Sequence, residues 1–240
     1  MGRSQQTAWE EALVASGLPV AGLDGPRGRP RFAAAAPLGA SIPGEAELLD
    51  VWLTERLPRW RVRVALQATL PPGHSLVDVY DVWLGEAPLP GRVAASVYRA
   101  VLGLVREAIP EPAVGRADDA SRIRLAAAAL LAEPTLPRKR PKGETTVAYD
   151  LRPFIEAIEV EAVDDGEALM VRATLRHDPE RGVGRPDELL AALSEQAGVT
   201  FDVRVLVRER LVLAAPPVPA ETVPRPRGPR PSQPRTRPGA

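Results

Sequence analysis

The sequence lacks cysteine altogether, and this absence excludes several classes of site. Disulfides, thiolate nucleophiles, zinc ribbons and iron–sulfur ligation all need that residue. No apolar run approaches the roughly 20 residues that span a bilayer, and the N-terminus has no apolar core of the signal-peptide kind. We therefore expect a cytoplasmic protein with no membrane contact.

Histidines and aromatic residues are also rare, with two histidines and 4% aromatics. His74 follows Pro-Pro-Gly and His177 precedes Asp178 at the end of a strand pattern, so both are expected to be exposed turn residues. The alternative is a general acid or base in RNA cleavage. No acidic cluster stands at ligand spacing, so the sequence predicts no catalytic residue, no metal site and no cofactor.

The four tryptophans are expected to pack in the core or between lobes rather than to stack on bases. They are Trp9, Trp52, Trp60 and Trp83.

Acidic and basic residues balance, at 31 each, so any nucleic-acid site must be local. Two segments concentrate positive charge and are predicted to form an electropositive groove between two lobes that binds RNA. The alternative is a pair of solvated loops whose charges are balanced elsewhere. The candidate binding residues are Arg27, Arg29 and Arg31 in the first segment, Arg138, Lys139, Arg140 and Lys142 in the second, and Arg152 shortly after it.

Residues 216–240 are rich in proline and arginine and hold almost no apolar side chains. Such a composition cannot bury enough surface to offset its ordering entropy, so a disordered tail is predicted. Five arginines face one glutamate there, giving the tail a charge of +4. A solubilising extension and a loose arm for RNA or a partner both fit this composition.

The first part of the chain shows a mixture of helix and strand patterns. Thr7 is expected to cap a helix that ends at Gly17. Alternating apolar residues predict strands over 47–54 and 75–84, whereas residues 59–70 fit a strand and a helix equally well.

The second part has a clearer order, read as β-α-β-β-β-α-β. A strand is predicted around 97–105, followed by a helix, three alternating strands, a helix from Pro186 to Gly198 and a last strand from Phe201. This order contains the split βαβ, or ferredoxin-like, pattern. We therefore predict an α+β fold of two tandem ferredoxin-like lobes, residues 1–90 and 91–215, with the first lobe lacking its opening strand.

Several short motifs follow one another along the chain. They are Gly17-Leu18-Pro19, Pro37-Leu38-Gly39, Leu70-Pro71-Pro72-Gly73, Asp150-Leu151-Arg152-Pro153 after the basic segment Arg138 to Lys142, and the helix start at Arg185 to Leu190. Their order resembles a bacterial family of uncharacterised proteins linked to radical SAM enzymes. The resemblance favours a helix over 59–70. Family members also begin with a strand and a Ser-His-Leu-Asp motif that this sequence lacks, so an upstream start, a partner, the tail or a rearranged first lobe must account for the unpaired edges.

The resemblance implies no established activity, and without cysteine this chain cannot perform radical SAM chemistry itself. The favoured hypothesis is a non-catalytic accessory module that binds RNA for a radical SAM enzyme acting in trans. The alternatives are an RNA-processing endonuclease of the tandem ferredoxin-like type and a protein-binding scaffold whose open sheet edge accepts a strand.

Overall fold

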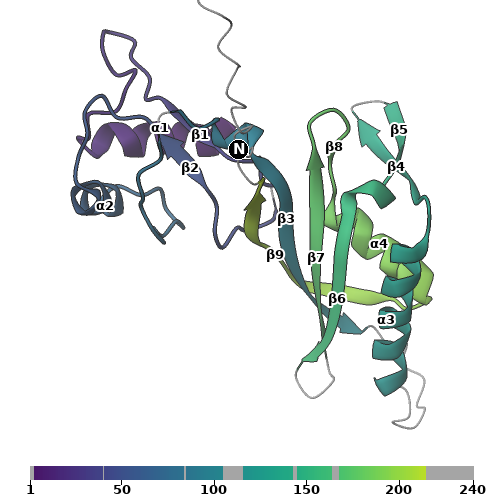
Figure 1. The fold of residues 1–240 in the computed structure, drawn as a ribbon. Coiled ribbons are helices and arrows are strands. Elements are labelled where there is room, and N and C mark those ends of the chain that lie inside the picture. The colour runs from purple at the N-terminus through teal and green to yellow at the C-terminus, as the bar shows by residue number, and fades with distance from the viewer. Residues whose placement is uncertain are drawn as a thin grey trace, which may run out of the picture.

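The computed structural model describes residues 3–39, 41–83, 85–104, 116–142, 145–163 and 168–214. The predicted tail, residues 216–240, lies outside this part of the chain. The described residues form a mixed α/β protein with antiparallel sheets. We call residues 3–91 the first lobe and residues 92–214 the second lobe, and Figure 1 shows the two side by side. No helix in the described residues is long and apolar enough to cross a membrane.

The first lobe packs two helices against a two-stranded sheet. Its helices are α1 (Arg3–Ala15) and α2 (Arg59–Gln67), its strands β1 (Phe32–Ala34) and β2 (Leu49–Val51), and a 3-10 turn, η1 (Leu89–Gly91), closes it. Leu13, Leu18, Val20 and Leu66 form the core between them.

Two helix predictions can be compared with these elements. The helix over 59–70 is confirmed by α2, and Gly17 has the left-handed φ of 64° expected after α1. The capping role predicted for Thr7 is wrong, because α1 begins four residues earlier at Arg3.

The predicted strand over 75–84 is also wrong, because residues 74–83 pair with no strand. Ion pairs hold this segment instead: Arg63 of α2 pairs with Asp78 at 2.5 Å, and Arg56, which precedes α2, pairs with Asp81 at 3.4 Å. In the described residues the first lobe therefore shows only β1 and β2 as strands, and a ferredoxin-like layout is not seen there.

The second lobe is built on an antiparallel sheet of order β6-β7-β3-β9, with β8 added beside β7. Its elements are β3 (Val93–Leu104), α3 (Arg116–Ala132), β4 (Pro137–Lys142), β5 (Thr145–Asp150), η3 (Arg152–Phe154), β6 (Ile155–Val163), β7 (Ala168–Asp178), β8 (Gly182–Val183), α4 (Pro186–Ala197) and β9 (Phe201–Leu213). The path β3-α3-β6 and β7-α4-β9 through this order is that of the split βαβ pattern. Gly198 has a left-handed φ of 61° and ends α4 as predicted.

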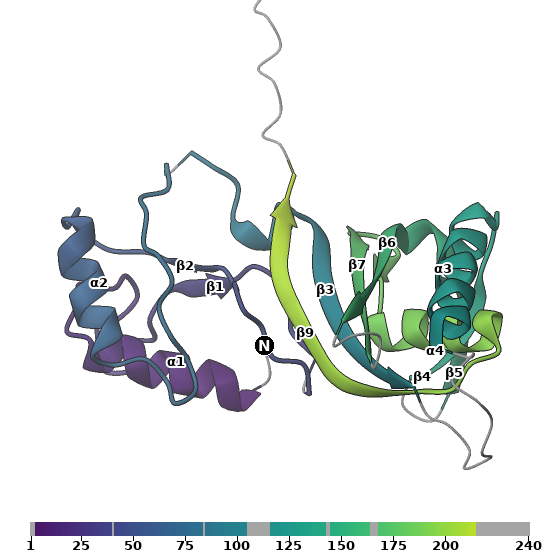
Figure 2. The same cartoon turned by 90° about the horizontal axis from the view of Figure 1, so that it is seen from below.

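Helices α3 and α4 lie together on one face of this sheet (Figure 2). Alternate strand residues meet them in a core that includes Leu102, Ile123, Leu169, Leu175 and Leu193. Among the described residues no helix covers the opposite face of the sheet, so that face can form a surface.

The second basic segment, Arg138 to Lys142, lies on a strand. β4 pairs with β5 in register from Pro137 opposite Asp150 to Lys142 opposite Thr145.

The two lobes meet at the start of β3 and the end of β9, which extend as a long ribbon toward the first lobe (Figure 2). The backbone of Arg208 on β9 bonds to Pro43 and Glu45, and an isolated parallel bridge joins Gly44 to Arg208. A small apolar core of Ala35, Ala36, Leu89 and Leu211 seals the contact. A segment of the first lobe thus covers part of the β9 edge.

Candidate nucleic-acid interface

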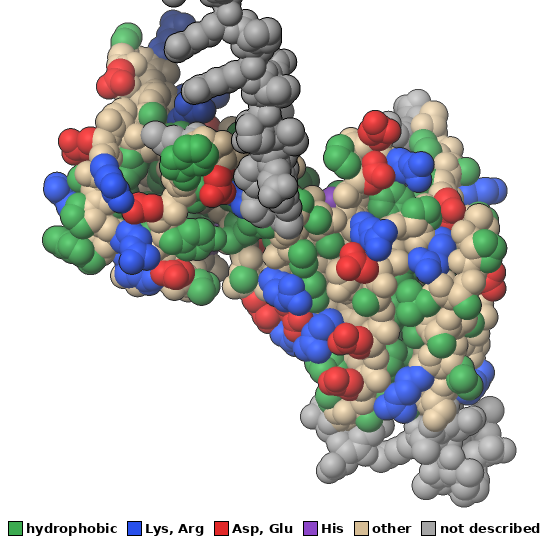
Figure 3. Space-filling view, viewed as in Figure 1, with side chains coloured by type: hydrophobic (Ala, Val, Ile, Leu, Met, Phe, Trp, Pro, Cys, Tyr) green, Lys and Arg blue, Asp and Glu red, His purple; other side chains and the backbone are tan. Residues whose placement is uncertain are grey.

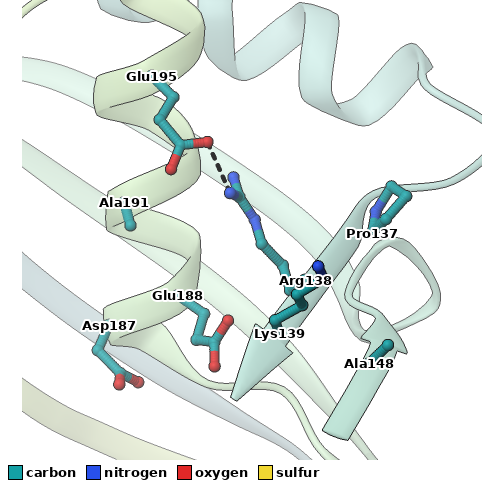
Figure 4. Close-up of a pocket in the computed structure, with 8 residues that line it drawn as sticks. All are labelled: Pro137, Arg138, Lys139, Ala148, Asp187, Glu188, Ala191 and Glu195. Carbon is teal, nitrogen blue, oxygen red and sulfur yellow. Dashed lines mark hydrogen bonds and ion pairs between the residues drawn. The ribbon is translucent and has the colours of Figure 1, made fainter. Parts of the chain in front are cut away.

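The basic strand β4 borders a groove of about 540 Å³ against helix α4 (Figure 4). The charged residues of the groove are Arg138, Lys139, Asp187, Glu188 and Glu195, and Pro137, Ala148 and Ala191 complete the lining. Three carboxylates thus oppose two cations. A phosphate would meet more negative than positive charge here, which disfavours the predicted role in RNA binding.

Arg138 also forms an ion pair within the protein. Its Nη1 lies 2.6 Å from Glu195 Oε2, and the side chain is only 16% exposed. Lys139 is exposed on the same strand. The side chains of Arg140 and Lys142 lie outside the described residues.

Arg152 has a structural role in this protein. Its guanidinium donates to three backbone carbonyls: Leu131 O at 2.6 Å, Ile155 O at 2.9 Å and Glu133 O at 3.1 Å. Two of these carbonyls lie at the end of α3, where a positive charge also suits the helix dipole. The side chain therefore ties α3 to β6, and each of its three nitrogens donates one hydrogen bond.

The arginines of the first basic segment sit on a closed turn of the first lobe. Arg31 N donates to Ala21 O at 2.7 Å, and Gly22, with a φ of 88°, begins the turn. The Arg31 guanidinium stacks over Trp52, 4.6 Å from the ring centroid. Arg27 and Arg29 are exposed and form no ion pair with any described residue.

The two basic segments do not line one groove. The turn of Arg27, Arg29 and Arg31 lies in the first lobe, whereas β4 lies at the far side of the second lobe, and both views place β3 and β9 between them (Figures 1 and 2). The shared electropositive groove predicted from the sequence is therefore absent from the described residues.

A basic and aromatic group on α2 was missed by sequence reasoning. Trp60, expected to be core, is 68% exposed, and it stands between the exposed residues Arg59 and Arg61 at the start of the helix. Trp83 is also exposed, so the core prediction is wrong for both tryptophans. The signal available in the sequence was helical spacing, since Val62, Ala65 and Leu66 share one face of a helix and Trp60 lies on the opposite face.

The helix-free face of the main sheet carries a paired charge network. Arg99 and Arg172 each reach Glu209 at 2.9 Å, with Glu45 and Glu159 at the ends of the chain of charges. Hydrogen bonds from Arg172 lower the pKa of Glu209 despite partial desolvation. Figure 3 shows the resulting mixture of blue and red side chains over the sheet.

This face also offers no aromatic platform for bases. The aromatic residues on the four described strands of the sheet path are Tyr98 and Phe201, and both pack on the helix-covered side. The sheet is thus unlike those that stack bases on strand aromatics.

His177 was expected in an exposed turn, but it is half-buried. Its Nε2 lies 2.8 Å from Oγ of the fully buried Ser96. His74 remains exposed as predicted and meets the edge of Trp9, with ring centroids 5.5 Å apart. The two histidines lie in different lobes, so they do not assemble a general acid–base pair.

The stability of the fold should fall as the pH drops below about 6.5, because of His177. Desolvation, and the nearby charge of Arg208, lower the pKa of His177 from its ordinary 6.5. Between the lowered pKa and pH 6.5, His177 is protonated in the unfolded chain and neutral in the folded chain. The free energy of unfolding therefore rises with pH over this range. Urea unfolding at pH 7.5 and 5.5 measures this loss. His177→Gln should reduce the difference and His74→Gln should not, whereas equal effects would contradict the assignment.

Comparison with known proteins places the chain in a family. The family described as "Uncharacterized protein conserved in bacteria (DUF2344)" matches residues 3–184, about three quarters of the sequence. The chain belongs to this family. DUF2344 thus covers the first lobe and the second lobe as far as β8, including every candidate cation described above.

Other comparisons add little to the DUF2344 assignment. No curated protein sequence matches the chain. One solved structure similar to it is a chain in the crystal structure of a Cbf5–Nop10–Gar1 complex, with 15% identity and a TM-score of 0.34 over 51% of this chain. The match spans about a third of that chain's length, 32%.

Proposed function

We propose that this DUF2344 protein is a non-catalytic module that binds single-stranded RNA on its first lobe. The observation that carries the proposal is Trp60, 68% exposed between Arg59 and Arg61. Proteins that bind single strands combine exposed aromatic rings, on which bases stack, with arginines that follow the phosphates. The start of α2 offers both within three residues.

Uncommitted charge supports the same lobe. Arg27 and Arg29 project from the closed turn, and Arg59 and Arg61 from α2, without a hydrogen bond or ion pair to any described residue. Arg138 and Arg152, by contrast, bind Glu195 and backbone carbonyls within the second lobe. The proposed RNA surface therefore lies on the first lobe alone, whereas the sequence predicted a groove between the two lobes.

The module is proposed to present RNA to a partner enzyme. A radical SAM enzyme acting in trans is the proposed partner, on the strength of the motif order described above. The absence of cysteine means that the cluster for such chemistry would have to come from that partner.

Fluorescence anisotropy with a labelled single-stranded RNA tests the proposal at low salt. Trp60→Ala should weaken binding by about 5- to 150-fold, the range expected for loss of one stacked base, and Trp60→Phe should weaken it less. Trp60 is largely exposed, so both variants should keep the unfolding midpoint of the parent. Absence of binding by the parent protein, or equal affinity of the parent and Trp60→Ala, would rule the proposal out.

A further inference from the structure

Residues 77–83, 85 and 86 form an exposed apolar and acidic segment on the first lobe, next to α2, whose Arg63 pairs with Asp78. Trp83 is 76% exposed, Val77 70% and Tyr80 55%. The backbone from residue 75 to residue 82 forms no backbone–backbone hydrogen bond with the described residues. So many large apolar side chains gathered on one short segment mark an interaction surface.

Negative charge accompanies these rings. The segment carries Asp78, Asp81 and Glu86, and the sequence has no lysine or arginine from residue 74 to residue 91. Each carboxylate is held from one side by an arginine, namely Arg63, Arg56 and Arg92. All three carboxylates remain exposed and can accept further hydrogen bonds.

The Trp83 ring lies against the backbone of Gly85. A Cβ atom built at Gly85 would lie 2.4 Å from Cζ3 of Trp83. A side chain at Gly85 would therefore push the ring from its place, and glycine keeps the ring where it is.

The chain leaves the second lobe beside this segment. Ala214 N donates to Arg92 O at 2.7 Å, and Arg92 in turn pairs with Glu86. Leu213 packs on the small core that contains Leu89. The chain beyond Ala214 therefore begins beside Arg92, whose ion pair with Glu86 connects it to the exposed segment.

Those residues, 215–240, have the composition that aromatic and acidic surfaces recognise. They hold nine prolines, five arginines and one glutamate. Proline-rich segments dock as preformed polyproline II helices on aromatic-lined surfaces, and arginines beside the prolines pair with carboxylates. At about 3.1 Å per residue, 26 residues reach about 80 Å, which is far more than the start point requires.

We propose that residues 215–240 dock on residues 77–83, 85 and 86 of the same chain, with prolines against Tyr80 and Trp83 and arginines against Asp78, Asp81 and Glu86. Covalent attachment raises the effective concentration of the tail to the millimolar range, so a weak contact suffices. The proposal does not depend on RNA binding, because it uses neither Trp60 nor the uncommitted arginines.

Limited trypsin digestion of the full chain, followed by mass spectrometry, tests the docking. Trypsin cuts Arg–Pro bonds poorly, so the bonds to follow are Arg227–Gly228 and Arg235–Thr236. With a docking constant of about 10, the tail should be cut about tenfold more slowly than a synthetic peptide of residues 215–240. The Tyr80→Ala/Trp83→Ala variant should lose this protection, and Trp60→Ala should keep it.

Two further measurements guard against a change of fold. Gly85→Ala, which displaces the Trp83 ring without removing it, should also speed cleavage, and added salt should do the same because the contact is partly ionic. Equal rates for the parent, the variants and the free peptide would overturn the proposal. Protection that grows with protein concentration would overturn the intramolecular form, because the tail would then be docking on another copy.

Discussion

Replacing Glu47 by alanine should lower the free energy of unfolding by about 3–5 kcal/mol, the usual cost of leaving a buried charge without its partner. Arg208 is only 1% exposed, and its Nε donates to Glu47 Oε1 at 2.8 Å while its Nη2 bonds to Glu47 Oε2. The same guanidinium donates to Pro37 O at 3.0 Å and Ala36 O at 3.2 Å. These bonds join the two lobes, so their loss should open the contact between them.

Urea unfolding of a small set of variants measures this effect. Glu45→Ala is the matched control, since Glu45 lies on the same segment but pairs with the partly exposed Arg99, a contact worth about 0–1 kcal/mol. The double variant Glu47→Leu/Arg208→Met removes both charges and should be more stable than Glu47→Ala. A loss below about 1 kcal/mol in Glu47→Ala would show that the pair does not hold the lobes together.

Arg152→Ala should cost about 2–3 kcal/mol of stability and leave RNA affinity unchanged. The physical reason is that three carbonyls, of Leu131, Glu133 and Ile155, would lose a charged donor, and hydrogen bonds to charged groups are worth about 1.5–3 kcal/mol each in favourable cases. Part of this site is exposed, so water should bind some of the freed carbonyls and reduce the loss of stability.

Arg152→Lys separates a structural role from phosphate binding. Lysine keeps the charge but has one ammonium nitrogen in place of the planar guanidinium, so it cannot reach all three carbonyls. We therefore expect most of the stability loss to remain. Urea midpoints and RNA anisotropy on the same samples give both readouts. A stable Arg152→Lys protein, together with weaker RNA binding by Arg152→Ala, would return Arg152 to the phosphate-binding role that the sequence suggested.

The second lobe was predictable because its elements are long and regular. The alternation in β7, the apolar face of α3 and the Pro186 and Gly198 boundaries of α4 are local signals, and the chain adopts the structures that they favour. The first lobe was less predictable for the opposite reason. Residues 75–83 alternate like a strand, yet pairing depends on a neighbouring edge that local sequence does not reveal.

The roles of the cations could not be read from the sequence, because their partners lie far along the chain. Arg138 meets a glutamate 57 residues away, and Arg208 meets Glu47 across 161 residues. A dense run of positive charge therefore suggested a binding site at β4, where packing against α4 supplies a surplus of carboxylates. Arg59 and Arg61 do not stand in such a dense run, yet the structure leaves both exposed.

The most direct test of the proposed RNA surface compares two matched pairs of basic residues in one salt titration. Arg59→Ala/Arg61→Ala should weaken binding of single-stranded RNA and reduce the slope of log affinity against log salt by about 1.4, or about 0.7 for each lost phosphate contact. Arg138→Ala/Lys139→Ala removes the same charge from the acidic groove and should change neither quantity. A larger loss from the β4 pair, or no loss from the α2 pair, would contradict the account.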